Sequence, residues 1–133
     1  TVKEAVGKPV IANGDIIDSA SAARALSLSG ADGVMIGREA YYNPYLLAPV
    51  DKELFGDSNA VVKTRKQIVE QMCDYIDDEV AKGVRLHSVV RHMLGLYQGV
   101  RGAKAWRRCL SENSHADDAD SSVLKAAMSH VEA

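Results

Sequence analysis

The chain has 133 residues, the length of one domain or of one domain with part of another. Its 47% hydrophobic and 26% charged residues are ordinary for a soluble globular protein. No apolar run approaches the ~20 residues that a helix needs to cross a bilayer, which excludes a membrane-spanning helix. The two cysteines, Cys73 and Cys109, stand in no CxxC or CxxH arrangement, so neither a disulfide framework nor a zinc site is indicated, and a reducing cytoplasmic setting is the simplest expectation.

Charge is distributed unevenly along the chain, although the formal net charge is only −2. The segment 80–111 contains no acidic residue but seven basic ones: Lys82, Arg85, Arg91, Arg101, Lys104, Arg107 and Arg108. A local positive excess of this size indicates a surface that binds a polyanion by neutralising phosphates. The alternative is a solvated basic helix face, and composition alone leaves both interpretations open.

The opening residues, 1–7, resemble the end of a helix, and with Thr1 in first place they indicate a fragment of a longer protein. The apolar runs 9–12 and 33–37 then predict two short buried strands. Between them, Asp18 or Ser19 can cap a helix that ends at Gly30. Two strands separated by a helix of this length predict a parallel pair with a right-handed crossover.

The second half of the chain has the pattern of helices. Segment 46–59 contains Pro49 and Gly56 and is expected to be irregular. From Ala60 onward the pattern is helical until Gly83 stops the helix. Apolar residues recur at i+4, namely Ile68, Met72, Ile76 and Val80, and with Val61, Val69 and Tyr75 alongside they make one apolar stripe. Three further amphipathic helices are expected at 86–98, 103–112 and about 119–131. Four helices with short connections predict a small bundle.

Two strand ends carry residues suited to an anion. Asn13-Gly14-Asp15 follows the first strand, and Gly37-Arg38 follows the second and opens a helix. Glycine lets backbone N–H groups approach an anion, a helix start points free N–H groups at it, and arginine adds a positive fork. In (β/α)₈ barrels, the loops after strands 7 and 8 form such a phosphate site. The alternative is that these residues only make turns and expose a surface charge.

The segments 9–16 and 31–44 closely resemble the end of the barrel in a known family, the tRNA-dihydrouridine synthases. The resemblance covers nearly the whole chain, from Val2 to Asn113. The segments 91–99 and 102–112, with Arg91-His92-Met93-Leu94-Gly95 and Trp106-Arg107-Arg108 in them, resemble the signature of the bacterial A-type members. The resemblance weakens over the last expected helix.

The resemblance implies a two-domain enzyme in which NADPH reduces FMN and the flavin passes a hydride to uracil rings in the D-loop of tRNA, around position 20. The protein would supply orientation and electrostatics, and the target base would be extruded from the folded tRNA. The resemblance also places the FMN phosphate on Asn13, Gly14, Asp15, Gly37 and Arg38. Asp15 stands where A-type members commonly have glycine, so its side chain is expected to turn away from the phosphate.

The same resemblance gives the basic segment the role of holding tRNA by its phosphates, through Arg91, His92, Arg101, Lys104, Arg107 and Arg108. Arg101, Lys104 and Arg108 share one helical face if the helix begins that early. His92 could instead be a buried, hydrogen-bonded histidine. Trp106 could stack on a base, but a core position is favoured.

The catalytic cysteine of the family lies on a loop outside this chain, so no catalytic residue is assigned. Cys73 and Cys109 lie beside apolar neighbours and are interpreted as buried, inert thiols. The remaining histidines, His87, His115 and His130, have no carboxylate or cysteine at ligand spacing, and no metal is proposed.

The sequence therefore predicts a mostly α-helical chain with a βαβ remnant, the end of a (β/α)₈ TIM barrel followed by a C-terminal helical bundle. Residues 1–50 would be the barrel remnant, 51–59 a linker, and 60–133 a helical tRNA-binding domain. The expected partners are tRNA, the missing N-terminal barrel and, through the apolar strands, further copies of the chain; no membrane is expected. Two alternatives stay open: another FMN- or phosphate-binding barrel acting on a small molecule, and a helical module that binds a protein.

Overall fold

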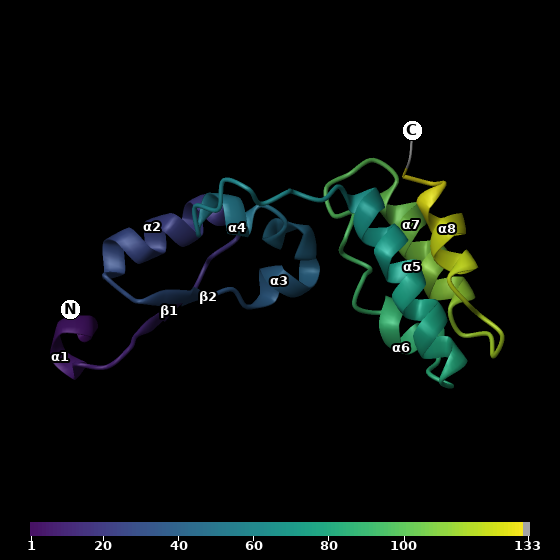
Figure 1. The fold of residues 1–133 in the computed structure, drawn as a ribbon, viewed down its shortest axis with the longest axis horizontal. Helices are drawn as coiled ribbons and strands as arrows, with labels where there is room; N and C mark the ends of the chain where they lie inside the picture. Colours follow the sequence, from purple (N-terminus) through teal and green to yellow (C-terminus); the bar gives the residue numbers. More distant parts are fainter. Residues whose placement is uncertain (132–133) are drawn as a thin grey trace. The chain divides into compact units, whose positions relative to one another are not determined.

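The computed structural model describes residues 1–131 of the chain, which divides into two compact units, Thr1–Val62 and Lys63–Ala133. Each unit has its own helices (Figure 1) and its own buried side chains, such as Ala22 in the first unit and Trp106 in the second. The fold is mostly helical with one small parallel sheet, as the sequence predicts. The last two residues of the predicted helical domain, 132 and 133, lie outside the described residues.

The first unit contains all the sheet structure among the described residues. Its elements in chain order are α1 (Val2–Val6), β1 (Ile11–Asn13), α2 (Ser19–Ser29), β2 (Gly33–Met35), α3 (Arg38–Tyr42), the 3₁₀ helix η1 (Pro44–Leu47) and α4 (Val50–Glu53). The predicted order of strand, helix and strand is confirmed. The prediction of an irregular segment at 46–59 is wrong in its first part, because the chain turns through η1 and α4 before it extends.

The two strands are parallel, as predicted, and β1 pairs with β2 in the register Ile11 to Gly33 and Asn13 to Met35. Asp32, which precedes β2, fixes this register from outside the ladder: its carboxylate accepts a hydrogen bond from the Val10 N–H at 2.8 Å. The expectation that both strands are buried is wrong for this chain. Ile11 is 57% exposed and Met35 is 48% exposed, since among the described residues the short sheet is packed mainly against one helix, α2.

The helix between the strands begins and ends where the sequence predicts. Asp18 is the N-cap of α2: its carboxylate accepts from the Ser21 N–H at 2.7 Å, and the Ser21 hydroxyl accepts from the Asp18 N–H at 3.0 Å. This reciprocal pair satisfies N–H groups that have no partner inside the helix. Gly30 ends α2 in the left-handed conformation, with φ 65°, which glycine adopts without strain.

The second unit consists of α5 (Arg65–Ala81), α6 (Leu86–Val90), α7 (Ala103–Asn113) and α8 (Ser122–Met128). The first of these starts five residues later than predicted, because Thr64 caps it and forms a capping box with Gln67. The last is shorter at both ends than the predicted 119–131. Within residues 1–131, no helix is long and apolar enough to cross a membrane.

The core of the second unit is centred on Trp106 of α7, which is fully buried together with side chains from all four helices: Val69, Ile76, Leu86, Val90, Leu110 and Leu124. The predicted core position of Trp106 is therefore confirmed, and base stacking by this side chain is excluded. Burying one such side chain contributes roughly 1.5–3 kcal/mol.

The buried stripe of α5 agrees with the prediction only in part. It consists of Val69, Cys73 and Ile76. Val69 and Ile76 belong to the predicted stripe, whereas its other members are half-buried or exposed: Val61, Ile68, Met72, Tyr75 and Val80. Cys73 is a buried thiol, as expected, and burial raises its pKa. Cys109 is half-exposed, so the prediction that it is buried is wrong.

The predicted helix 86–98 ends at Val90, and the chain continues to Gly102 in successive turns. Two side chains hold this segment by bonding to its carbonyl groups. The Trp106 Nε1–H donates to the Met93 carbonyl at 3.3 Å, and the Arg65 Nε–H donates to the Leu96 carbonyl at 2.8 Å. These bonds replace helical ones, and Gly99 lets the chain turn with φ 79°. Local periodicity does not reveal such distant partners.

The Gly102→Ala variant should unfold far more easily than the Gly99→Ala variant. Both glycines have positive φ, 88° and 79° respectively, so each alanine costs roughly 1–2 kcal/mol of backbone strain. At Gly102 the added methyl would also lie 2.2 Å from the His130 carbonyl oxygen, whereas at Gly99 no atom lies within 4 Å. We expect a total loss of about 2–5 kcal/mol for Gly102→Ala. Urea unfolding followed by Trp106 fluorescence measures both, and equal losses would contradict the packing described here.

Candidate functional site

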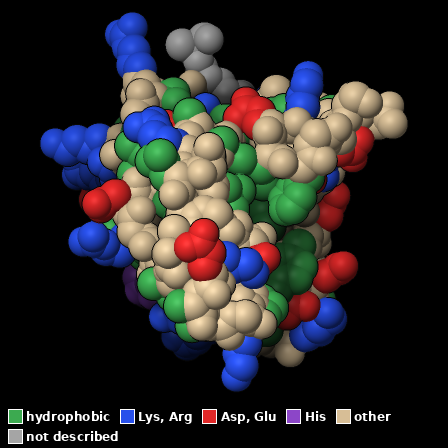
Figure 2. All heavy atoms as spheres, turned by 90° about the vertical axis from the view of Figure 1, so that its left-hand side faces the viewer, with side chains coloured by type: hydrophobic (Ala, Val, Ile, Leu, Met, Phe, Trp, Pro, Cys, Tyr) green, Lys and Arg blue, Asp and Glu red, His purple; other side chains and the backbone are tan. Residues whose placement is uncertain are grey.

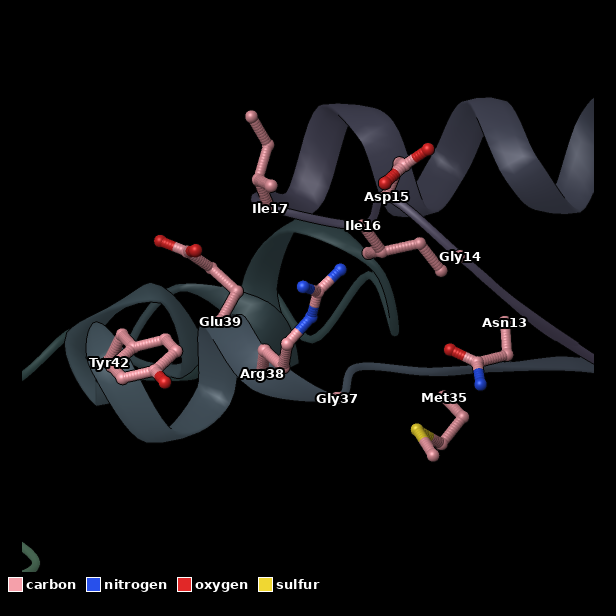
Figure 3. Close-up of a pocket in the computed structure, with 10 residues that line it drawn as sticks. All are labelled: Asn13, Gly14, Asp15, Ile16, Ile17, Met35, Gly37, Arg38, Glu39 and Tyr42. Carbon is pink, nitrogen blue, oxygen red and sulfur yellow. The ribbon is translucent and has the colours of Figure 1, made fainter.

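The first unit contains a cavity of about 500 Å³ at the ends of its two strands (Figure 3). All five residues predicted to hold an anion line it: Asn13, Gly14, Asp15, Gly37 and Arg38. Parallel strands end at the same edge of a sheet, so the register of Asn13 with Met35 brings these two segments together. The structure also adds residues that the sequence did not single out: Ile16, Ile17, Met35, Glu39 and Tyr42.

Backbone conformation makes one wall of this cavity accessible to a ligand. Gly14 has φ 127°, and no atom lies within 4 Å of the position where a Cβ would stand. Asp15 follows with φ 51°, a left-handed conformation that aspartate tolerates better than most residues. The chain therefore presents peptide groups at this point with few side-chain atoms in front of them.

The opposite wall is formed by the start of α3. Gly37 is its N-cap, and Arg38 is its first residue. In Figure 3 the Arg38 guanidinium extends from α3 toward Ile16 on the opposite segment. Its planar group suits the oxygens of a phosphate. Asp15 and Glu39 place two carboxylates on the same cavity, so an anion would bind only close to Arg38 and the glycine peptides.

In the second unit, the predicted RNA-binding residues lie at or near the surface. Arg91, His92, Arg101, Lys104 and Arg108 are exposed, and Arg107 is half-buried. His92 accepts a hydrogen bond from the Arg91 Nε–H at 3.1 Å, and the alternative of a buried His92 is wrong. Arg101 does not share a helical face with Lys104 and Arg108, because α7 begins only at Ala103.

Ion pairs divide the seven basic residues into two groups. Lys82 pairs with Glu79 at 2.8 Å, Arg85 with Asp117 at 2.6 Å, and Arg108 with Glu112 at 2.8 Å. The absence of acids within 80–111 therefore does not make all seven available to a partner. The other four form no ion pair with a carboxylate among residues 1–131: Arg91, Arg101, Lys104 and Arg107. Within that same part of the chain, no three His, Cys, Asp or Glu side chains come together to hold a metal ion.

A cluster around His87 was not predicted from the sequence. The His87 and His115 rings stack with their centroids 4.0 Å apart, and His87 Nδ1 lies 3.4 Å from the Ser114 hydroxyl. Partial burial, and then the nearby His115 and Arg91, lower the pKa of His87 from its usual 6.5. These residues lie 28 positions apart in the sequence, so no local spacing reveals the contact.

The fold and the strand-end cavity define a mainly helical α/β chain with one site suited to an anion and a separate basic helical surface. Comparison with known proteins identifies it further. A model of the dihydrouridine synthase family matches residues 1–132, and the chain belongs to that family.

Individual relatives agree with this assignment. The chain is 56% identical over 100 residues to a tRNA-dihydrouridine(20/20a) synthase of Vibrio parahaemolyticus. It is 50% identical over 101 residues to the protein of that name from Shewanella oneidensis, and 50% identical over 100 residues to the one from Escherichia coli. These matches cover 75% or 76% of this chain but only 29% or 30% of the relatives, so the chain spans less than a third of their length.

Stability should fall on acidification because of His87. Its folded-state pKa is lowered, so the unfolded chain takes up the proton first, and the free energy of unfolding decreases as pH falls below about 6.5. Above that pH, the contribution of His87 to the free energy of unfolding does not change with pH. The urea concentration at the unfolding midpoint, measured between about pH 5 and pH 8, should decrease less with falling pH in the His87→Gln variant than in the parent chain. His115→Gln should show part of the same change, because it removes one neighbouring cation. Slopes equal to that of the parent chain in both variants would contradict this assignment.

Proposed function

We propose that this chain is the C-terminal part of an FMN- and NADPH-dependent tRNA-dihydrouridine synthase that reduces D-loop uridines of tRNA, around position 20, to dihydrouridine. The observation that carries the proposal is the family match over residues 1–132, together with about 50% identity to proteins named tRNA-dihydrouridine(20/20a) synthase. In this proposal the first unit is the end of a (β/α)₈ barrel, and the second unit is a helical tRNA-binding domain. The chain alone would not turn over substrate.

The residues of the strand-end cavity fit the phosphate of FMN. The Gly14 peptide is open to approach, and Arg38 supplies a positive charge at the start of α3. In the proposed arrangement these groups, together with Asn13, Gly37 and the backbone of Asp15, anchor the phosphate end of the cofactor, and the Asp15 side chain is turned away from it. When bound, FMN supplies the hydride chemistry. The role of this chain is to fix the position of the cofactor by its phosphate, away from the carboxylate of Glu39.

Exposed apolar side chains of the first unit support its place within a larger barrel. They include Val2, Ile11, Ile17, Leu28 and Met35, each about half exposed or more. Figure 2 shows hydrophobic side chains reaching the surface on the face that it presents. A surface of this kind is usually covered by another part of a protein. We propose that the preceding barrel strands and helices cover it, and that the isolated chain associates with itself through it.

The basic residues of the second unit that pair with no carboxylate among residues 1–131 support a polyanionic partner. Arg107 and Lys104 project from the same side of α7, since they lie three residues apart and flank the buried Trp106 position. Arg91 and Arg101 lie in the turns that pack against this helix. Binding of a polyanion by these four residues gives the basic segment a role. A flavin barrel that acts on a small molecule would have no use for this segment.

Binding of unmodified tRNA to the chain should weaken linearly with the logarithm of salt concentration. The double variant Lys104→Ala/Arg107→Ala should lose about tenfold or more in affinity at low salt, and its salt slope should be shallower by roughly 1.5. The matched control is Lys82→Ala/Arg85→Ala, which removes the same two residue types from existing ion pairs and should change both quantities less. A folded chain that binds no tRNA at low salt would overturn the proposed RNA-binding role.

The phosphate role of the strand-end cavity can be tested separately with FMN and riboflavin, which differ only in the phosphate group. Addition of FMN should shift the backbone amide NMR signals of Gly14, Gly37 and Arg38, and riboflavin should not. The Arg38→Gln variant should show about tenfold weaker shifts at the same FMN concentration, because it loses a charge-assisted hydrogen bond. Glu39→Gln serves as a control and should bind FMN at least as well. Equal shifts with riboflavin would contradict the assignment.

A further inference from the structure

The second unit has a small cavity of about 60 Å³ beside α6 and α7 that none of the assigned roles explains. Its lining combines an apolar floor with hydrogen-bond donors. Val90, Leu94 and Leu110 form the floor, and the polar lining residues are His87, Arg91, Ser111, Ser114 and His115. Among residues 1–131, no carboxylate lines it. A site with donors, a permanent cation and no acid from that part of the chain is suited to an anion, and its volume admits a group about the size of one phosphate.

The donors of this cavity are held in place by contacts within the unit. Ser114 is buried, and its hydroxyl lies 3.4 Å from His87 Nδ1, so a hydroxyl that donates to Nδ1 leaves His87 Nε2–H as a donor. The His87 ring also stacks on His115. Arg85 and Asp117, each two residues away from one of these histidines, form an ion pair that ties the same two segments together.

The cavity continues the basic face of α7. Ser111 lies one helical turn after Arg107 and seven residues after Lys104, which puts all three on one side of the helix. The adjacent face of the helix, with Trp106 and Leu110, is buried in the core. A polyanion lying along Lys104 and Arg107 would therefore reach Ser111 and Arg91 at the end of the same surface.

We propose that His87, Arg91, Ser111 and His115 form a subsite for one backbone phosphate of the bound RNA. This inference rests on the proposed binding of tRNA and adds a site to it. Arg91 supplies a permanent charge, His87 and Ser111 donate hydrogen bonds, and the exposed His115 closes the cavity from the solvent side. An anion at this position stabilises the protonated imidazoles, so RNA binding and proton uptake are coupled.

The charged groups around His87 set the direction of this coupling. Arg91 and His115 face it and disfavour its protonation in the free protein. The Arg85 and Asp117 side chains neutralise each other, and Glu112, farther along α7, is paired with Arg108. A phosphate in the cavity would offset the charges of Arg91 and His115. Affinity for RNA should therefore rise as pH falls through the range in which His87 takes up a proton.

The test is titration of the chain with unmodified tRNA at constant ionic strength from about pH 8 to pH 5.5. Affinity should increase by about tenfold towards low pH. This is the change expected when binding raises the pKa of one coupled group by about one unit. The double variant His87→Gln/His115→Gln should bind tRNA at pH 8 but show less than a threefold increase. Trp106 fluorescence checks that the variant is folded.

A second pair of variants tests the position of the anion without changing a histidine. Ser111→Asp puts a carboxylate at the rim of the cavity, and Asn113→Asp adds the same charge to the same helix, two residues further on and away from the cavity. Ser111→Asp should weaken tRNA binding at least fivefold more than Asn113→Asp. If tRNA binds but both variants behave alike and the pH dependence survives in the histidine double variant, the subsite is wrong and the proposed tRNA binding stands. If the parent chain binds no tRNA, both proposals fail.

Discussion

The second unit depends on one buried side chain, Trp106. Its ring fills the centre of the helical core, and its N–H donates to the Met93 carbonyl in a segment that is not helical. Tyr97, from the same turning segment, packs on it with ring centroids 4.7 Å apart. A single residue of α7 thus holds the connection between α6 and α7 against the core. The surface positions of Arg91 and Arg101, which lie on this connection, follow from that contact.

The first unit depends on a different constraint, the parallel pairing of two three-residue strands. Pairing of Ile11 with Gly33 forces Asn13 and Met35 to end side by side, and the chain after each strand then faces the same cavity. The sheet itself buries little. Its geometry is fixed mainly by α2, with its capping box at Asp18, and by the Asp32 carboxylate bonded to the Val10 N–H. Such a unit is suited to completing a larger sheet.

Local chemistry explains which features the sequence predicts well. Each cap of α2 follows from residues within a few positions of it, as Asp18 with Ser21 shows. The parallel strands and the strand-end cavity join segments more than 20 positions apart, but one strand–helix–strand step is enough to predict that they meet. The predicted ends of the helices are wrong where contacts with residues far away in the sequence determine the backbone conformation. Arg65 bonds to the Leu96 carbonyl over 31 positions, and the 86–98 helix is interrupted there. The stack of His87 on His115 has the same origin, and so do the ion pairs that divide the basic residues.

Charge counts along the sequence overestimate what a surface offers to a partner. Seven basic residues without an acid between them look like a uniform patch, yet three are neutralised by carboxylates from outside that segment. The remaining positive residues lie on one side of α7 and on the turns before it. The surface is therefore directional, and a bound polyanion would have a preferred path across it.

The strand-end cavity has an evolutionary consequence, because its open wall consists of peptide groups. A contact made by main-chain N–H groups survives any substitution that leaves the local conformation unchanged. Asp15, with φ 51°, occupies a conformation that glycine and aspartate can both adopt. Sequence drift at this position can therefore alter the charge near the site while the main-chain contacts persist, so divergent members could keep a ligand whose neighbouring side chains they no longer share.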